Sequence, residues 1–565
     1  MALSKIFSGD LPELTHEIIQ YFRKDISTLY SCILVNRLWC RLAIPLLWED
    51  PFSLLTQNSH YINTYLCLLN EDGKARFNEY GINNNLLLSN TSFNYPRYIK
   101  YLDTFKISNS VEDWVITLKY NYNHMLGKLV YRSLIEVLLL ENKVNSHSFE
   151  VILDMNFTYT SYFDDTVDLI LQNPNLTKYN IRGLTLSYDS LLESEYTLSF
   201  LKFLCSNYNS ISSIVFKFPK YRIKIKNYKL VENYLSPIII SQKNLKKISF
   251  ESFINLYNTF LTLKNSNCSN TLNTIIFYFI NFKNIINILQ EVFDQLNVLE
   301  SIHIIYCDSL NSDFIQQIIK VIKPFKLRSL FMKEIIPNDH IESLLLLLQK
   351  FCDCLENFGF GSGEIGQVFY RIQKQQLFEF IMKYCKKIRY FYSGIPYYGN
   401  NSIYLFIEKN QHNINYLTIE ADINSYYDYS ELSSTVLQNL GQVLPSKLEY
   451  LCLALSFITS DLEIFLKNSQ NTFIKKLLIS NKFQYTPPRK EDTKILFFIK
   501  KYIIKKERIK YLAIVEADSN GSTEPVKLFF LKDEVNEYKL HNIIVQKYDD
   551  LYMDAHSYIN NHLQY

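Results

Sequence analysis

Apolar residues between Leu11 and Pro51 recur at three- and four-residue spacing, and polar residues divide them into three short groups. This spacing places apolar side chains on one face of a helix, so each group predicts a short helix. The first helix is expected to begin at Pro12, because proline fits the first turn of a helix, and to run to about Phe22. Its apolar residues are Leu14, Ile18, Ile19 and Phe22.

Two further helices are expected in the same stretch. Asp25 or Ser27 can cap the second through a side-chain oxygen. The third is expected to end near Pro45, because proline lacks a backbone donor and disfavours helix in the residue before it. The apolar residues of these two helices are Leu29, Cys32, Ile33, Leu34 and Val35, then Leu38, Trp39 and Leu42. Helices this small bury little surface, so the group is expected to gain stability from a neighbour or a partner.

The rest of the chain repeats a strand-like unit, Φ-x-x-Φ-x-Φ with Φ apolar, after a helix-like stretch and a polar break. The clear units follow one another at steps of about 26 to 35 residues, a period typical of solenoid proteins. One helix and one strand per step predict an α/β repeat array. The units begin at Leu176, Ile211, Leu245, Leu272, Leu299, Leu327, Leu355, Ile388, Ile414, Leu448, Ile474 and Ile509, with weaker examples at Ile99, Leu134 and Leu540.

Composition sets outer bounds on this picture. A chain of 565 residues exceeds one ordinary core, which fits several domains or a repeat array. The net charge of +3 indicates neither nucleic acid nor membrane as a partner, and we expect neither. Runs of about eighteen apolar residues and a secretory signal pattern are both missing from the sequence. The ten scattered cysteines are therefore expected to be reduced, and the expected compartment is the cytoplasm or the nucleus.

The stretch from Leu11 to Pro51 resembles an F-box. In that family an LP pair opens the first helix, an aliphatic pair follows, and a V-x-R-x-W-like run precedes an L-W pair. The matching residues here are Leu11-Pro12, Ile18-Ile19, Val35-Asn36-Arg37-Leu38-Trp39 and Leu47-Trp48. Asn36 is a small departure, because the family usually has serine or cysteine after the valine.

The resemblance implies docking onto the Skp-type adaptor of a cullin-RING ubiquitin ligase. Residues that would face the adaptor, or support that face, are Leu11, Pro12, Glu13, Ile18, Ile19, Leu34, Val35 and Trp39. The alternative is that the three helices only cap a larger fold, with Trp39 in its core.

The repeat array is similar to a leucine-rich-repeat solenoid, especially the longer type with a full helix per repeat. The resemblance implies parallel strands on the concave side, with their x side chains on the concave surface, and helices on the convex side. The family's Asn or Cys after the last Φ is met by Cys307, but Ser456, Lys482 and Ala517 do not fit, so we expect an irregular solenoid. A helical solenoid or an ordinary α/β fold is the alternative.

The expected domains are an F-box at residues 1–52, a helical or loop connector at 53–94 and the leucine-rich-repeat-like solenoid at 95–565.

Patterns that suggest an enzyme are few. Gly361–Gly366 matches G-x-G-x-x-G between a strand and a helix, where a phosphate-binding turn belongs, but no acidic residue ends the next strand and no kinase motif follows. The run His16-Glu17-Ile18-Ile19-Gln20 lacks the second histidine of a zinc helix. Cys352 and Cys354 have no second pair at zinc spacing, so buried thiols explain them. We therefore expect no catalytic residues, cofactor or metal.

A basic stretch from Lys475 to Lys510 contains many lysines and few acids. Most of these lysines can lie on the solvated face of one repeat, and the alternative is a site for an acidic segment or a phosphate. The polar, tyrosine-rich run from Asn424 to Tyr429 is expected to be an exposed loop that could contact a partner.

Together these patterns predict a non-catalytic substrate receptor of an SCF-type ubiquitin ligase. Its F-box would bind the Skp-type adaptor, and through it cullin, while the solenoid would bind an unidentified target protein. One alternative is a protein-interaction scaffold that recruits no ligase, and a remote one is a nucleotide-binding enzyme at Gly361–Gly366.

Overall fold

The computed structural model divides into two compact units. Unit 1 comprises Met1–Ser252, Tyr257–Leu272 and Leu296–Val298, and unit 2 comprises Phe253–Leu256, Asn273–Gln295 and Leu299–Tyr565. The structure describes residues 12–23, 25–53, 58–82, 93–118, 124–140, 149–154, 160–172, 181–187, 195–207, 209–218, 228–252, 255–265, 267–332, 341–360, 371–394, 402–421, 430–481, 495–504, 508–516 and 526–563.

Three short helices open unit 1: α2 (Pro12–Tyr21), α3 (Ile26–Ile33) and α4 (Arg37–Leu47). Asp25 caps α3, because its carboxylate accepts a hydrogen bond of 3.2 Å from the Thr28 backbone N–H. Asn36 caps α4 in the same way, through a bond of 2.9 Å from the Trp39 N–H. The residue that departs from the F-box pattern therefore fixes where the third helix begins.

The third helix ends near Pro45, as predicted, but the proline does not terminate it. Helix α4 continues through Pro45 to Leu47, and the Trp48 N–H donates to the Ile44 carbonyl at 3.1 Å. Leu46 and Leu47 are both buried. Their packing outweighs the single hydrogen bond that proline removes so close to the helix end.

The remainder of unit 1 alternates helices with short parallel strands. Its further helices are η1 (Pro51–Ser53), α5 (Asn58–Leu66), α6 (Glu71–Asn78), η3 (Tyr95–Tyr98), α7 (Thr104–Thr117), α8 (His124–Leu140), α9 (Thr160–Gln172), α10 (Glu195–Asn207), α11 (Tyr228–Ser241), α12 (Tyr257–Thr262), η6 (Leu263–Asn265) and η7 (Asn267–Asn270). Its strands are β1 (Tyr101–Asp103), β2 (Phe149–Asp154), β3 (Ile181–Ser187), β4 (Ser213–Lys217) and β5 (Lys247–Glu251), each parallel to the next.

Unit 2 is built on a longer series of parallel strands in sequence order. They are β6 (Thr274–Tyr278), β7 (Ser301–Cys307), β8 (Lys326–Met332), β9 (Asn357–Phe360), β10 (Tyr390–Gly394), β11 (Tyr416–Glu420), β12 (Lys447–Leu455), β13 (Phe473–Asn481) and β14 (Ile509–Glu516). Strand β15 (Val526–Lys527) pairs antiparallel with β14, and β16 (Ile544–Val545) pairs parallel with it.

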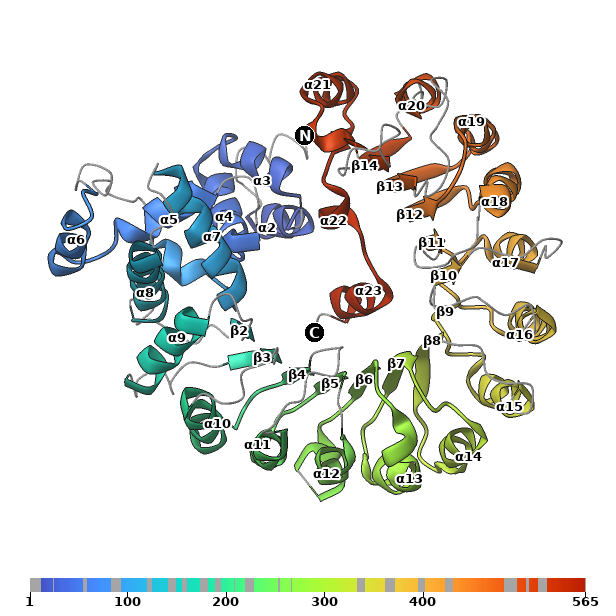
Figure 1. The fold of residues 1–565 in the computed structure, drawn as a ribbon, viewed down its shortest axis with the longest axis horizontal. Coiled ribbons are helices and arrows are strands. Elements are labelled where there is room, and N and C mark those ends of the chain that lie inside the picture. The colour runs from blue at the N-terminus through green and yellow to red at the C-terminus, as the bar shows by residue number, and fades with distance from the viewer. Residues whose placement is uncertain are drawn as a thin grey trace. The chain divides into compact units, whose positions relative to one another are not determined.

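Helices connect these strands and lie along one face of the sheet of unit 2 (Figure 1). They are η8 (Phe282–Asn284), α13 (Ile286–Gln295), α14 (Ser312–Lys320), α15 (Ile341–Phe351), α16 (Arg371–Tyr384), α17 (Ser402–Asn410), α18 (Ser430–Val443), α19 (Thr459–Asn468), α20 (Ile495–Ile503), η12 (Leu528–Phe530) and α21 (Lys532–Leu540). Two short helices, α22 (Tyr548–Leu551) and α23 (Ala555–His562), lie on the opposite face. The protein therefore has a solenoid-like α/β fold.

Strands lie at most of the predicted repeat positions. Every clear unit from Ile211 to Ile509 coincides with one of β4 to β14, and the weaker unit at Ile99 leads into β1. The strand predicted at Leu134 was wrong, because Leu134 lies inside α8. The unit at Leu176 falls almost entirely outside the described residues, and β3 begins at its last position, Ile181. Leu540 ends a helix, four residues before β16.

Side chains alternate between the two faces of the sheet in unit 2. Ile302 and Ile304 of β7 face an apolar space that Phe293 of α13 and Phe314 of α14 also line. Ile305, the next residue, belongs to a separate cluster on the other face of the sheet, together with residues of α23. The Φ positions therefore pack against the helices, as the repeat pattern predicts.

An asparagine holds one of the strand-to-helix turns. The buried Asn481 amide donates to the Phe457 carbonyl at 3.1 Å, and its oxygen accepts from the Phe457 N–H at 3.2 Å. Cys307 is the one residue that matches the Asn or Cys expected after the last Φ of a leucine-rich repeat. Its thiol donates to the Phe277 carbonyl at 3.4 Å. The repeat pattern places Lys482 at the position of the expected Asn or Cys, one residue beyond Asn481.

Replacing Asn481 by alanine is expected to destabilise unit 2 by about 1–3 kcal/mol, because both backbone groups of Phe457 would stay buried without these partners. Urea unfolding monitored by circular dichroism measures this loss. Asn207→Ala, which removes an exposed asparagine that bonds the Phe203 carbonyl of its own helix, is the matched control and should change stability little. Equal midpoints for the two variants would contradict the assigned role.

Candidate protein-interaction surfaces

The first candidate surface is the outer side of α2. Two apolar stripes run along this helix at spacings of four and three residues. One stripe, Thr15, Ile19 and Phe22, is directed inward, since Thr15 is fully buried and Ile19 is 1% exposed. The other contains Leu14, Ile18 and Tyr21, of which Leu14 is 42% and Tyr21 is 85% exposed. The helix therefore presents an apolar stripe to solvent.

The turn after α3 adds further exposed apolar side chains. Leu34, the C-cap of α3, is 86% exposed, and Val35 next to it is 43% exposed. A leucine this exposed contributes nothing to the core of unit 1. Leu34 and Val35 therefore add two exposed apolar side chains to the three-helix group.

The residues predicted to serve the adaptor separate into contact and support positions. Pro12, Glu13, Leu34 and Val35 are exposed, and Ile18 is half-buried. Ile19 and Trp39 are buried, so they can only support the outer surface. Leu11 lies outside the described residues.

A buried carboxylate connects these helices to the rest of unit 1. Glu49 is 6% exposed and accepts hydrogen bonds from Arg23 at 2.7 Å and from Lys100 at 3.0 Å. Its backbone carbonyl also accepts from the Lys100 N–H at 2.9 Å, just before β1. The hydrogen bond from Arg23 to this carboxylate raises the pKa of the arginine. The three helices are thereby fixed to the beginning of the strand series.

Aromatic packing reinforces this connection. The Trp48 ring lies 3.9 Å from the Tyr95 ring and 5.4 Å from the Tyr65 ring, centroid to centroid. Tyr65 of α5 is fully buried, and burial raises its pKa well above the ordinary value. The hydroxyls of Tyr30 of α3 and Tyr61 of α5 are hydrogen-bonded at 3.1 Å. These contacts join α3 and the end of α4 to α5 and η3 within unit 1.

The second candidate surface is the face of the unit 2 sheet that lacks the connecting helices. Aromatic residues recur on this face at x positions of the repeat: Phe331, Tyr390, Tyr392, Tyr416 and Tyr450. We call residues Tyr548–Leu563, which include α22 and α23, the inner segment, because they lie across this face (Figure 1).

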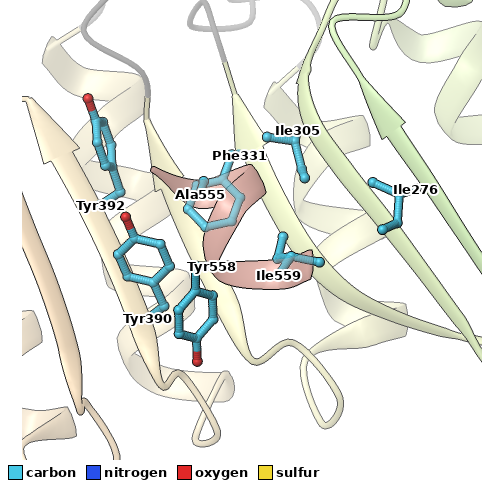
Figure 2. Packing of buried hydrophobic residues seen from close by; sticks show 8 residues of the cluster. All are labelled: Ile276, Ile305, Phe331, Tyr390, Tyr392, Ala555, Tyr558 and Ile559. Atoms are coloured by element: carbon cyan, nitrogen blue, oxygen red, sulfur yellow. The ribbon is translucent and has the colours of Figure 1, made fainter. Parts of the chain in front are cut away.

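Helix α23 packs its apolar side on these strands. Ala555, Tyr558 and Ile559 are buried together with Ile276, Ile305, Phe331, Tyr390 and Tyr392, as Figure 2 shows. The Tyr558 ring lies 4.7 Å from the Tyr390 ring and 4.6 Å from the Tyr416 ring. Leu551 of α22 is buried in a neighbouring cluster with Tyr450, Cys452, Leu478 and Ala513.

Polar contacts surround this apolar centre. The Tyr552 hydroxyl donates to the Glu420 carboxylate at 3.2 Å, and the Tyr392 hydroxyl donates to the same oxygen at 2.9 Å. The Tyr416 hydroxyl lies 3.2 Å from Nε2 of His562. Burial raises the pKa of the Tyr416 hydroxyl to about 12.

The strand x positions of unit 2 lie on the face away from the connecting helices, but over part of the sheet that face is not open to a target. Tyr390 is 1% and Tyr450 is 1% exposed, because the inner segment covers them. The sequence analysis placed residues 548–563 within the solenoid at 95–565 and predicted no separate role for them. Leu551, Ala555, Tyr558 and Ile559 recur at four-, three- and one-residue spacing, a pattern that could have indicated a helix with one apolar side.

The basic stretch provides ion pairs and a helix cap. Lys500 lies 2.6 Å from the Glu534 carboxylate and Lys501 lies 2.8 Å from that of Glu463. Arg508 is 5% exposed and donates to the backbone carbonyls of Ser469 and, at 3.4 Å, Leu466. Burial lowers the pKa of Arg508 to about 10. These contacts favour a structural role for the described basic residues; Lys505 and Lys506 lie outside the described residues.

The other candidate sites add no chemistry that the structure describes. Gly361–Gly366 and Asn424–Tyr429 lie outside the described residues. His16 and Glu17 are exposed on α2. Within the described part of the chain, no group of three or more His, Cys, Asp or Glu side chains is placed to hold a metal ion.

None of the ten cysteines forms a disulfide in the structure. Cys307 and Cys385 are buried, and burial raises the pKa of each thiol to about 12. Cys352 is only partly buried, and its thiol donates to the Gln349 carbonyl at 3.4 Å.

Iodoacetamide at pH 8 is therefore expected to alkylate Cys352 of the native protein much faster than Cys307 or Cys385, since the thiolate is the reactive form. Peptide mass spectrometry after timed quenching measures the three rates. Denatured protein is the control, in which all three should react alike. Fast labelling of Cys307 in the native protein would contradict its burial.

Comparison with known proteins gives no further assignment: no family model matches the chain, and no curated protein is similar to it. Among the residues that the structure describes, none of the helices is both long enough and apolar enough to span a membrane.

Proposed function

We propose that the protein is the substrate-recognition subunit of an SCF-type ubiquitin ligase. In this proposal α2, α3 and α4 form an F-box that docks onto a Skp-type adaptor, and through it onto cullin. The repeat array, proposed as an irregular leucine-rich-repeat solenoid, binds the target protein. The protein itself catalyses nothing.

The observation that carries the proposal is the solvent exposure of apolar side chains on α2 and after α3. Leu14 and Tyr21 on the outer stripe of α2, and Leu34 and Val35 after α3, are exposed in a helical group that already has a buried stripe. Four of the positions that the F-box resemblance assigns to adaptor contact or its support are exposed: Pro12, Glu13, Leu34 and Val35. Exposed apolar surface on a small, capped helical group is typical of a docking site.

The mechanism of such a subunit is proximity. A target lysine held near a ubiquitin-loaded enzyme reacts at a raised effective concentration, without any catalytic group on the receptor. The Glu49 ion pairs and the aromatic packing of Trp48 support this role, because a rigid connection preserves the distance between adaptor and strands within unit 1.

The test is complex formation between purified components. The full chain and a purified Skp-type adaptor are mixed and separated by size exclusion, and a one-to-one complex is expected. A folded chain that forms no complex at micromolar concentration would refute the proposal. It would favour a scaffold that recruits no ligase.

A further inference from the structure

The parallel strands of unit 2 are paired in the order of the sequence. From β6 to β14, each strand is hydrogen-bonded to the next one along the chain. In a stack of this kind each repeat contacts its neighbours, so stability is close to a sum of neighbour terms and the stack can open from an end. Strand pairing by itself therefore gives no reason for β6 and β14 to open together.

The inner segment crosses these strands in the reverse of their order (Figure 1). Near its start, Leu551 is buried in one cluster with Leu478 of β13 and Ala513 of β14. Near its end, the His556 ring stacks on the Tyr278 ring of β6, with 4.2 Å between the ring centroids. The inner segment thus reaches from one end of this strand series to the other.

Hydrogen bonds attach the middle of the inner segment to three strands between these ends. The Tyr390 hydroxyl of β10 donates to the Met553 carbonyl at 3.3 Å, and the Met553 N–H donates to the Tyr450 hydroxyl of β12 at 3.1 Å. The Tyr552 hydroxyl donates to the Glu420 carboxylate of β11 at 3.2 Å. The bonded residues lie 163, 103 and 132 positions apart in the sequence. Pairing between neighbouring strands supplies no contacts of this range.

The apolar side chains of the inner segment are buried only while several strands are in place. Leu551, Tyr558 and Ile559 are each at most 5% exposed, and the clusters that bury them contain side chains of more than one strand. Helices α22 and α23 have four and eight residues, and helices this short are marginal in water. Opening one strand beneath the inner segment therefore weakens its contacts with the other strands as well.

We infer that the inner segment is a strap that couples strands β6 to β14 of unit 2 into one cooperative unit. With the strap in place, the two ends of this strand series open in a single unfolding step. Unit 2 then meets any partner as one body, and the strands under the strap belong to its core. The inference concerns unit 2 alone and requires neither the adaptor nor a target, so it stands or falls independently of the proposed function.

The test perturbs one end of the strand series and measures hydrogen exchange at the other. Ile479→Val removes one carbon atom from a fully buried side chain of β13. Leu478, the residue before it, belongs to the cluster beneath the strap, so Ile479 faces the opposite side of the sheet. The substitution therefore leaves the contacts of the strap in place. Hydrogen exchange read by mass spectrometry reports the opening of β13 and of β7 separately.

With the native strap, Ile479→Val is expected to speed exchange of the slowest amides of β7 and β13 by the same factor, about threefold to tenfold. Tyr558→Ala combined with Ile559→Ala weakens the strap. In that background Ile479→Val should speed exchange in β13 and leave β7 nearly unchanged. Ser557→Ala combined with Asn561→Ala, at exposed positions of α23, is the matched control and should behave as the native strap does.

Two results would overturn the inference. If Ile479→Val speeds exchange in β13 but not in β7 of the chain with the native strap, the two ends open separately and the strap couples nothing. If β7 responds to Ile479→Val equally when the strap is weakened, the coupling runs through the paired strands. Ile559→Ala alone replaces the double variant if that variant does not fold, and the first comparison requires no strap variant.

Discussion

Replacing Leu34 and Val35 together by lysine is expected to weaken binding of a Skp-type adaptor at least 100-fold, about 2.7 kcal/mol or more. Both side chains are exposed, so the change removes apolar contact area and leaves two cations without partners in the interface. Lysine is chosen because Leu34 is the C-cap of α3, where a positive charge suits the helix dipole. Titration calorimetry with the purified adaptor measures the loss.

The matched control is Ile322→Lys, which makes the same kind of change at an apolar residue of unit 2 that is 84% exposed. This variant should bind the adaptor as the native chain does. Thermal unfolding should be unchanged in both proteins, because neither site is part of a core. If the double variant and the control bound the adaptor with equal affinity, the turn after α3 would not be part of the proposed interface.

Replacing Gly359 by valine is expected to destabilise unit 2 by about 3 kcal/mol. Gly359 of β9 lies in register with Tyr392 of β10 and Phe331 of β8. A Cβ there would lie 2.5 Å from the Tyr392 carbonyl oxygen and 2.9 Å from Cδ1 of Phe331, which is closer than atoms can approach. Because the first of these atoms is backbone, the strands themselves would have to move.

Hydrogen exchange of the β9 and β10 amides measures this effect locally, since faster exchange reports easier opening of the sheet. Lys326→Val is the control, because it places the same side chain at the exposed first residue of β8. Exchange rates of β9 and β10 that are as slow in Gly359→Val as in the control would contradict the close packing.

The strands were predictable because their signal is local. Leu299, Ile302 and Ile304 carry the repeat pattern within six residues, and the structure places a strand there. Leu134 carried the same pattern but lies in α8, because a continuous apolar run within a long helix satisfies the strand template by chance. The rule for proline is also local: helix α4 continues two residues beyond Pro45, because the burial of Leu46 and Leu47 depends on tertiary contacts.

The candidate surfaces were predictable only in part. The F-box resemblance assigned both Leu34 and Trp39 to the adaptor-binding surface or its support. Only the packing in the structure shows that the leucine is exposed and the tryptophan is buried. The inner segment was missed because its partners are distant in sequence; 163 positions separate Tyr390 from Met553. No local pattern indicates which face of a sheet a remote helix will cover.

The most direct test of the proposed docking is hydrogen exchange of the full chain with and without a saturating Skp-type adaptor. The account predicts that protection increases in α2 and α3 and in the turn at Leu34, while β6 to β13 and the inner segment exchange as before. Protection that appears on these strands or on the inner segment, with none in α2 or α3, would contradict it.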